Sequence, residues 1–126
     1  MRSRRACRDD RGAVTAELVL GIPVLLGVVV GLVWLLAVGA AQVRAVDAAR
    51  ETARAAARGE DRSVALAAGR RVLPEGVVEL SEDGEQVTAV ASARIDPPGG
   101  LFDALAGITV RAEAHALREP DLGSAP

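Results

Sequence analysis

Few side chains in this 126-residue sequence belong to the types that carry out catalysis. It contains one histidine, His115, and one cysteine, Cys7, whereas an active site or a metal centre needs several such groups held together. His115 falls on the polar side of a predicted strand, where an exposed side chain is expected. Asp83 and Glu85 flank Gly84, and shaping and solvating a turn accounts for both carboxylates. The sequence therefore predicts a protein that is not an enzyme, with no cofactor, no metal and no small-molecule substrate.

Charge is distributed unevenly along the chain. The formal net charge is −2, but five arginines against two aspartates give the first twelve residues +3, which leaves −5 for the rest. An acidic main body does not match a nucleic-acid partner, so none is expected. Cys7 lies among these arginines without the apolar run that a lipoprotein signal needs before its cysteine. We interpret it as an incidental residue.

The residues from Arg11 to Glu17, RGAVTAE, stand where the basic leader meets the apolar run, and they combine two small residues with one carboxylate. A protease site needs a small residue at the scissile position, so a cut between Gly12 and Ala13 is sterically possible. The cut would leave a new ammonium group on Ala13, close to the Glu17 carboxylate. A charge in a spanning helix carries an insertion penalty of about 2.5 to 3.5 kcal/mol at the centre and less near the end. Glu17 therefore needs a compensating partner, unless it is an ordinary first-turn acid that interacts with the helix dipole.

These residues precede an uncharged stretch from Leu18 to Val43, which the sequence predicts to cross a membrane as a helix. Its roughly 26 residues, at ~1.5 Å each, reach about 39 Å, more than the ~30 Å hydrocarbon core of a bilayer. A helix buried in a soluble core is one alternative, but the remaining chain is too small to surround it. A secretory signal cut after Ala41 is another, although its apolar part would be about 7 to 15 residues long.

Three features of this span bear on its orientation and packing. The denser positive charge precedes it, so we expect the N-terminus in the cytoplasm and the main body outside the cytoplasm. Gly27 and Gly31 form a small-xxx-small pair that would let a partner helix approach closely, although such pairs also arise by chance. Pro23 has no amide hydrogen to donate and is expected to loosen the first turns of the helix.

Helical sequence continues beyond the span. Residues 44–58 are rich in alanine and in paired charges, which predicts one long helix over 13–58 that stops at Gly59. A second, shorter helix is expected over 63–73, because Pro74 cannot continue it.

The rest of the chain has the alternation of strands. Strands are predicted at 77–80 and 87–95 around the Gly84 turn, and a third begins at Ile108. The expected fold class is α+β, a long N-terminal transmembrane helix continuing into a small ectodomain with a second helix and a three-stranded antiparallel sheet. The predicted organisation is a basic leader over 1–12, the long helix over 13–58 with its transmembrane part at about 18–43, the ectodomain over 59–118 and a loose tail over 119–126.

The predicted ectodomain has little material for a core. Phe102 is its one aromatic residue, and alanine, valine and leucine supply the rest. Such a core buries little area per residue, so we expect marginal stability. The domain either folds against the long helix or a partner subunit, or is just stable enough alone.

The leader boundary resembles a known signal. A basic leader ending in Gly, a small residue after it, Glu at the fifth position after the Gly and then an apolar run look like the class III signals of type IV pilins. Prepilin peptidases cut such leaders on the cytoplasmic side after the Gly, which implies cleavage here between Gly12 and Ala13. In pilins the Glu, here Glu17, is attributed a pairing with the amine of a neighbouring subunit during assembly.

The stretch from Arg11 to Arg58 is similar to the TadE family of minor pilins or pseudopilins in tight-adherence (Tad/Flp) pilus systems. Glu17, Pro23 and the Ala-Ala-Arg-Glu segment that ends at Glu51 carry the similarity. Family members more often have Phe where this chain has Leu18, and the C-terminal region matches only in outline. The resemblance implies a non-catalytic part in pilus assembly, with the prepilin peptidase, the assembly platform and other pilins as partners and membrane lipid around the helix.

Two other functions stay open. A signal-anchored extracytoplasmic adaptor or binding module of the cell envelope would retain Met1 to Gly12, and a secreted protein would be released after Ala41. The pilin interpretation instead places the chain in the cell membrane as a single-pass protein, or in an extracellular pilus.

Overall fold

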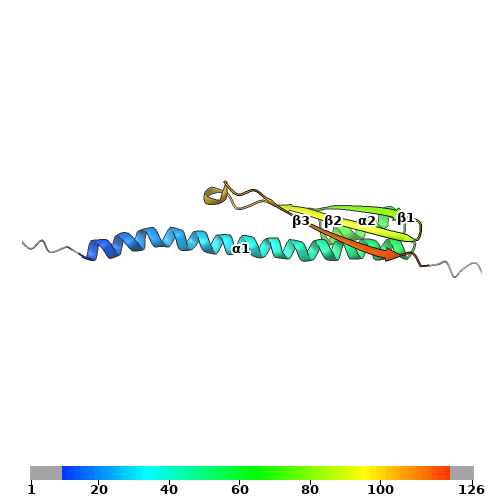
Figure 1. Cartoon of the computed structure of the whole chain (residues 1–126), viewed down its shortest axis with the longest axis horizontal. Helices are drawn as coiled ribbons and strands as arrows, with labels where there is room; N and C mark the ends of the chain where they lie inside the picture. The colour runs from blue at the N-terminus through cyan, green and yellow to red at the C-terminus, as the bar shows by residue number, and fades with distance from the viewer. Residues whose placement is uncertain (1–9, 120–126) are drawn as a thin grey trace, which may run out of the picture. The chain divides into compact units, whose positions relative to one another are not determined.

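The computed structural model describes residues 10–119, with the side chains of Asp10, Arg11 and Leu101 left aside. The elements in chain order are α1 (Asp10–Ala57), α2 (Arg62–Val72), β1 (Val77–Asp83), β2 (Gln86–Ile95), a 3₁₀ turn η1 (Gly100–Phe102) and β3 (Ile108–Leu117), as Figure 1 shows. The predicted fold class is confirmed, because a long apolar helix is followed by a second helix and a three-stranded antiparallel sheet. Residues 1–9 of the predicted leader, Cys7 among them, and 120–126 of the predicted tail lie outside the described residues.

Helix α1 is a single helix of 48 residues that contains Pro23. It ends as the sequence predicts, because Gly59 adopts a φ of 82°, a left-handed conformation that glycine reaches without steric cost. The amide of Gly59 donates to the carbonyl of Ala56 at 3.0 Å, and that of Glu60 donates to the carbonyl of Ala55 at 3.3 Å. These two bonds form a Schellman motif, which satisfies carbonyls that the helix end would otherwise leave unpaired.

The chain divides into two compact units between Val33 and Trp34, which we call the N-terminal and C-terminal units. Described residues of the N-terminal unit belong to α1, and their large apolar side chains are exposed apart from the half-buried Val30. By length and composition, α1 over Gly12–Ala57 is able to cross a membrane, and none of its most apolar window is buried. A signal sequence also fits that description, whereas a soluble core helix would be mostly buried.

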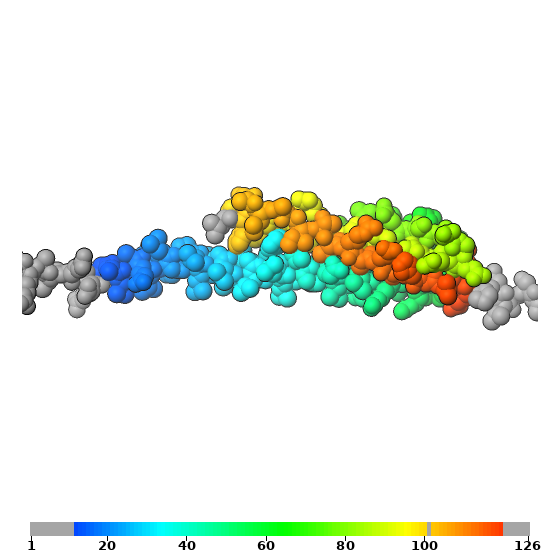
Figure 2. Space-filling model, in the orientation of Figure 1, coloured from blue at the N-terminus to red at the C-terminus, as the bar shows by residue number. Residues whose placement is uncertain are grey.

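The C-terminal unit has two layers. Its sheet has the order β1-β2-β3, with each neighbouring pair antiparallel and Asp83 opposite Gln86 at the Gly84 turn. Buried and more exposed residues alternate along β2, and the buried set is Val87, Ala89, Ala91 and Ala93. This face packs against α2 and the second half of α1, and Figure 2 shows β3 (orange) lying directly on α1 in this unit.

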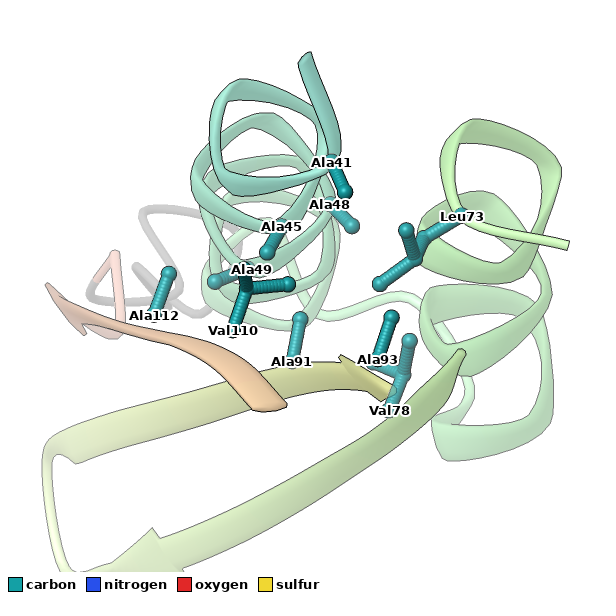
Figure 3. Packing of buried hydrophobic residues seen from close by; sticks show 10 residues of the cluster. All are labelled: Ala41, Ala45, Ala48, Ala49, Leu73, Val78, Ala91, Ala93, Val110 and Ala112. Atoms are coloured by element: carbon teal, nitrogen blue, oxygen red, sulfur yellow. The ribbon is translucent and has the colours of Figure 1, made fainter. Parts of the chain in front are cut away.

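Alanine dominates the core of this unit. Among the described residues, 13 of the 18 buried hydrophobic side chains are alanine. On α1 they include Ala41, Ala45, Ala48 and Ala49. Figure 3 shows Ala45 and Ala49 facing the strand residue Val110, and Ala41 and Ala48 on the side toward Leu73. Methyl groups on both sides bring the helix close to the sheet. Phe102, in contrast, is only half-buried and belongs to neither core cluster, so the one aromatic residue of the predicted ectodomain adds little to this core.

The two helices meet at Gly69 of α2. Thr52 of α1 is fully buried there and donates its hydroxyl to the Ala48 carbonyl at 2.9 Å. A Cβ atom at position 69 would collide with the Thr52 hydroxyl and would press on the Ala48 carbonyl and on Val78. Gly69 is therefore required by the close approach of α1 and α2, although its φ is ordinary for a helix.

We expect Gly69→Ala to destabilise the C-terminal unit by about 1 to 3 kcal/mol, the usual cost of overpacking a tight core. Thermal unfolding of the full chain in detergent, followed by circular dichroism, measures the effect. Gly39→Ala is the matched control, since a Cβ there meets nothing within 4 Å, and in α1 it should raise stability by up to about 1 kcal/mol. Equal melting temperatures for Gly69→Ala and the unmodified chain would contradict the close approach.

Candidate processing and assembly site

The predicted cleavage point lies in the first turn of α1. Gly12 and Ala13 are both exposed, and a Cβ added to Gly12 would meet no atom within 4 Å. Packing among the described residues therefore does not require glycine at position 12. Backbone amides in the first turn of a helix have no intrahelical acceptor, so opening the chain at this bond breaks few hydrogen bonds.

Glu17 lies one turn further along, at the edge of a shallow hollow on α1. The hollow is lined by Val14, Glu17, Leu18, Gly21, Ile22 and Leu25, whose spacing of three and four places them on one side of the helix. Gly21 creates it, because no side chain fills the space one turn after Glu17 and a Cβ there would meet nothing within 4 Å. The arrangement presents one carboxylate at an otherwise apolar, shallow hollow.

The Glu17 carboxylate has no ion-pair or hydrogen-bond partner among the side chains that the structure describes. Helix α1 carries no further charge from there to Arg44. A carboxylate in this position is costly to place in hydrocarbon unless a cation or donor reaches it. Any such partner within the apolar segment has to come from another molecule, or from outside the described residues.

The predicted contact pair, Gly27 and Gly31, lies further along α1, and both residues are half-buried. Val30 shares their helix face and is half-buried too, whereas Val28 and Val29 are exposed. The helix thus has a narrow, small-residue strip at this level. Its use as a contact with a partner helix stays a prediction.

Residues 12–54 match the model of the family described as TadE-like protein. Over these residues the chain is similar to TadE-like proteins. No curated protein and no solved structure matches the chain. This TadE-like segment covers 43 of the 126 residues. It contains all five predicted site residues, from Gly12 to Gly31, and also the buried Thr52.

Downstream of the TadE-like segment, His115 is exposed on the outer face of the sheet, as predicted. Its Nδ1 atom lies 3.0 Å from the Thr88 hydroxyl and its Nε2 atom lies 3.3 Å from a Glu113 oxygen. Within residues 10–119 no group of three or more His, Cys, Asp or Glu side chains is placed to hold a metal ion. The surroundings of His115 are those of a surface side chain in a polar row across the strands.

Sequence reasoning missed two side chains in the TadE-like segment that join α1 to the sheet and its following loop. Trp34 Nε1 donates to the Asp96 carbonyl at 3.1 Å, and Gln42 Nε2 donates to the Arg111 carbonyl at 3.2 Å. Both residues fall within the uncharged stretch assigned to the membrane. A tryptophan and a glutamine in an apolar stretch were the available signal, because each carries a donor that needs an acceptor.

The end of the C-terminal unit where α1 stops is strongly charged, which the sequence did not reveal. A hollow there is lined by Arg58, Gly59, Glu60, Asp61, Arg62, Glu82, Arg118 and Glu119. Arg58 pairs with Glu60 at 2.7 Å, and Arg118 pairs with Glu82 at 2.6 Å. The hydrogen bond to Glu60 raises the pKa of Arg58. These two ion pairs and the other charged lining residues make this end hydrophilic.

Proposed function

We propose that the chain is a non-catalytic minor pilin or pseudopilin of the TadE-like type, which takes part in assembling a tight-adherence (Flp-type) pilus after a prepilin peptidase removes its leader. The observation that carries the proposal is the lone Glu17 carboxylate at an otherwise apolar, shallow hollow, five residues after Gly12 and inside the TadE-like segment. The exposed apolar surface of the N-terminal unit supports a membrane location before assembly.

The proposed mechanism pairs a group near Gly12 of one subunit with Glu17 of a neighbouring subunit. Hydrolysis of the Gly12–Ala13 bond leaves an ammonium group on Ala13. The Ala13 ammonium of one subunit then pairs with the Glu17 carboxylate of its neighbour, which lowers the cost of holding both charges at the membrane edge. The space at Gly21 lets the neighbouring helix come close enough for that pair.

The partners of this function are the prepilin peptidase, other pilins, the assembly platform and the lipid around the helix. The N-terminus would be cytoplasmic, and the C-terminal unit would be extracytoplasmic as an ectodomain. No step requires a cofactor or a small-molecule substrate.

Intact-mass measurement of the native protein tests the proposal. In cells with an active prepilin peptidase the chain should begin at Ala13, and in the same cells without the peptidase it should retain residues 1–12. A chain that keeps residues 1–12 in both cell types would be a signal-anchored adaptor, and a chain that begins after Ala41 would be a secreted protein. Either result removes the pilin proposal.

A further inference from the structure

We infer that the end of the C-terminal unit formed by Trp34 and the loop of residues 96–107 lies on the bilayer surface. The hydrocarbon core would then be crossed by residues 13–33 instead of by the whole uncharged stretch to Val43. This inference rests on the proposed function in one respect, the anchoring of α1 in a membrane.

The first step is that α1 residues from Trp34 to Val43 are already engaged within the C-terminal unit. Ala41 is buried in the core, Val38 packs against the same cluster, and Gln42 donates to the Arg111 carbonyl. Lipid chains cannot surround a helix whose side is covered by a sheet with polar backbone groups at its edge. The chain therefore leaves the hydrocarbon at or before Trp34.

The second step is the length that remains. Residues 13–33 form about 32 Å of helix at ~1.5 Å per residue, close to the ~30 Å hydrocarbon core. This span begins at the residue that the proposed cut makes the new N-terminus. Trp34 then falls at the outer interface, where tryptophan is enriched because its ring is apolar and its N–H group needs an acceptor. That acceptor is the Asp96 carbonyl at 3.1 Å.

The third step concerns the loop that the Trp34 hydrogen bond holds at this level. Asp96 begins it, and between Asp96 and Arg111 the sequence has one charged residue, Asp103. Leu105 is 49% exposed, Ile108 is 36% exposed, and Phe102 is half-buried. Exposed leucine and isoleucine beside an interfacial tryptophan are side chains that favour the boundary between headgroups and acyl chains.

The opposite end of the C-terminal unit has the reverse character. All the residues lining its hollow are charged except Gly59. Residues 34–57 of α1 separate the two ends by about 35 Å, at ~1.5 Å per residue. One end is suited to the bilayer surface and the other to water, which gives the unit a defined orientation above the membrane.

Site-directed spin labelling of the full chain in vesicles of phosphatidylethanolamine and phosphatidylglycerol tests this inference. Leu105→Cys and Leu117→Cys, each combined with Cys7→Ser, give matched labels on two exposed leucines, 49% and 73% exposed. Strand β3 has 10 residues, so Leu117 lies about 30 Å from Ile108 at ~3.3 Å per residue. Power saturation then compares collisions of each nitroxide with oxygen, which concentrates in lipid, and with a water-soluble nickel chelate.

The ratio of oxygen to nickel collisions should be several-fold higher at position 105 than at position 117. Equal ratios at the two positions, in protein that floats with the vesicles, would overturn the surface contact and leave the membrane anchor intact. A label at position 105 shielded from both reagents would show that protein covers the loop, which also overturns it. Failure of the unmodified chain to float with vesicles would remove the anchor, and with it both the inference and the proposed function.

Discussion

Replacing Gly12 with valine should block removal of residues 1–12 while leaving membrane insertion unchanged. Gly12 is exposed and its Cβ would meet nothing within 4 Å, so valine adds no clash inside the chain. Its branched side chain would instead occupy the space that a protease requires at the scissile bond. A misfit of about 2.7 kcal/mol in the transition state would slow the cut roughly 100-fold, which leaves nearly all of the chain unprocessed.

Intact mass of the membrane fraction measures this effect, because the unprocessed chain is heavier by residues 1–12. Gly21→Val is the matched control, since Gly21 lies on the same helix, is exposed, and also has open space around its Cβ. That variant should be processed normally. Normal processing of Gly12→Val would show that position 12 is not the site of cleavage.

The Glu17→Ala variant should fail at a later step. It leaves the Gly12–Ala13 bond untouched, so the leader should still be removed, and it removes an insertion penalty, so the chain should stay in the membrane. Without the carboxylate, the Ala13 ammonium of the neighbouring subunit has no counter-charge. Breaking an ion pair shielded from water costs about 3 to 5 kcal/mol, enough to reduce incorporation into the pilus more than 100-fold.

Comparing the sheared pilus fraction with the membrane fraction tests this prediction. Glu17→Gln separates charge from shape, because it keeps the length of the side chain and should fail as Glu17→Ala does. Val14→Ala changes an apolar residue of the same hollow and should assemble nearly normally. Wild-type amounts of Glu17→Ala in the pilus fraction would show that the carboxylate has no role between subunits.

Local chemistry made much of the fold predictable. Glycine at position 59 ended the long helix, and Asp83 with Gly84 marked the hairpin, because left-handed and tight-turn backbones favour these residues. Alternation from Ile108 onward predicted the third strand, and Val110 and Ala112 are indeed the buried side. The second helix, expected over 63–73, is observed at Arg62–Val72.

Contacts between distant segments were not predictable in the same way. A hydropathy profile treats Leu18 to Val43 as one stretch, because the same apolar residue types suit a helix face against lipid and a helix face against an alanine-rich sheet. The structure separates the two parts, because Ala41 is buried and Trp34 and Gln42 donate to carbonyls more than 60 residues away in the sequence. The need for glycine at position 69 was not predictable either, since it comes from the Thr52 side chain on another helix. The sequence predicted the spacing from Gly12 to Glu17 in the candidate site. The hollow at Gly21 became visible only in the structure.

The alanine interface between α1 and the sheet determines which mutations the C-terminal unit can accept. Truncation of an alanine there removes one methyl group, so the cavities that weaken ordinary cores are small at these positions. Almost every other substitution adds volume at a contact with no spare space. We therefore expect glycine and serine to be the only substitutions tolerated at Ala45, Ala48 and Ala49. The outward-facing Arg50 and Arg54, on the same turns, are free to vary in size.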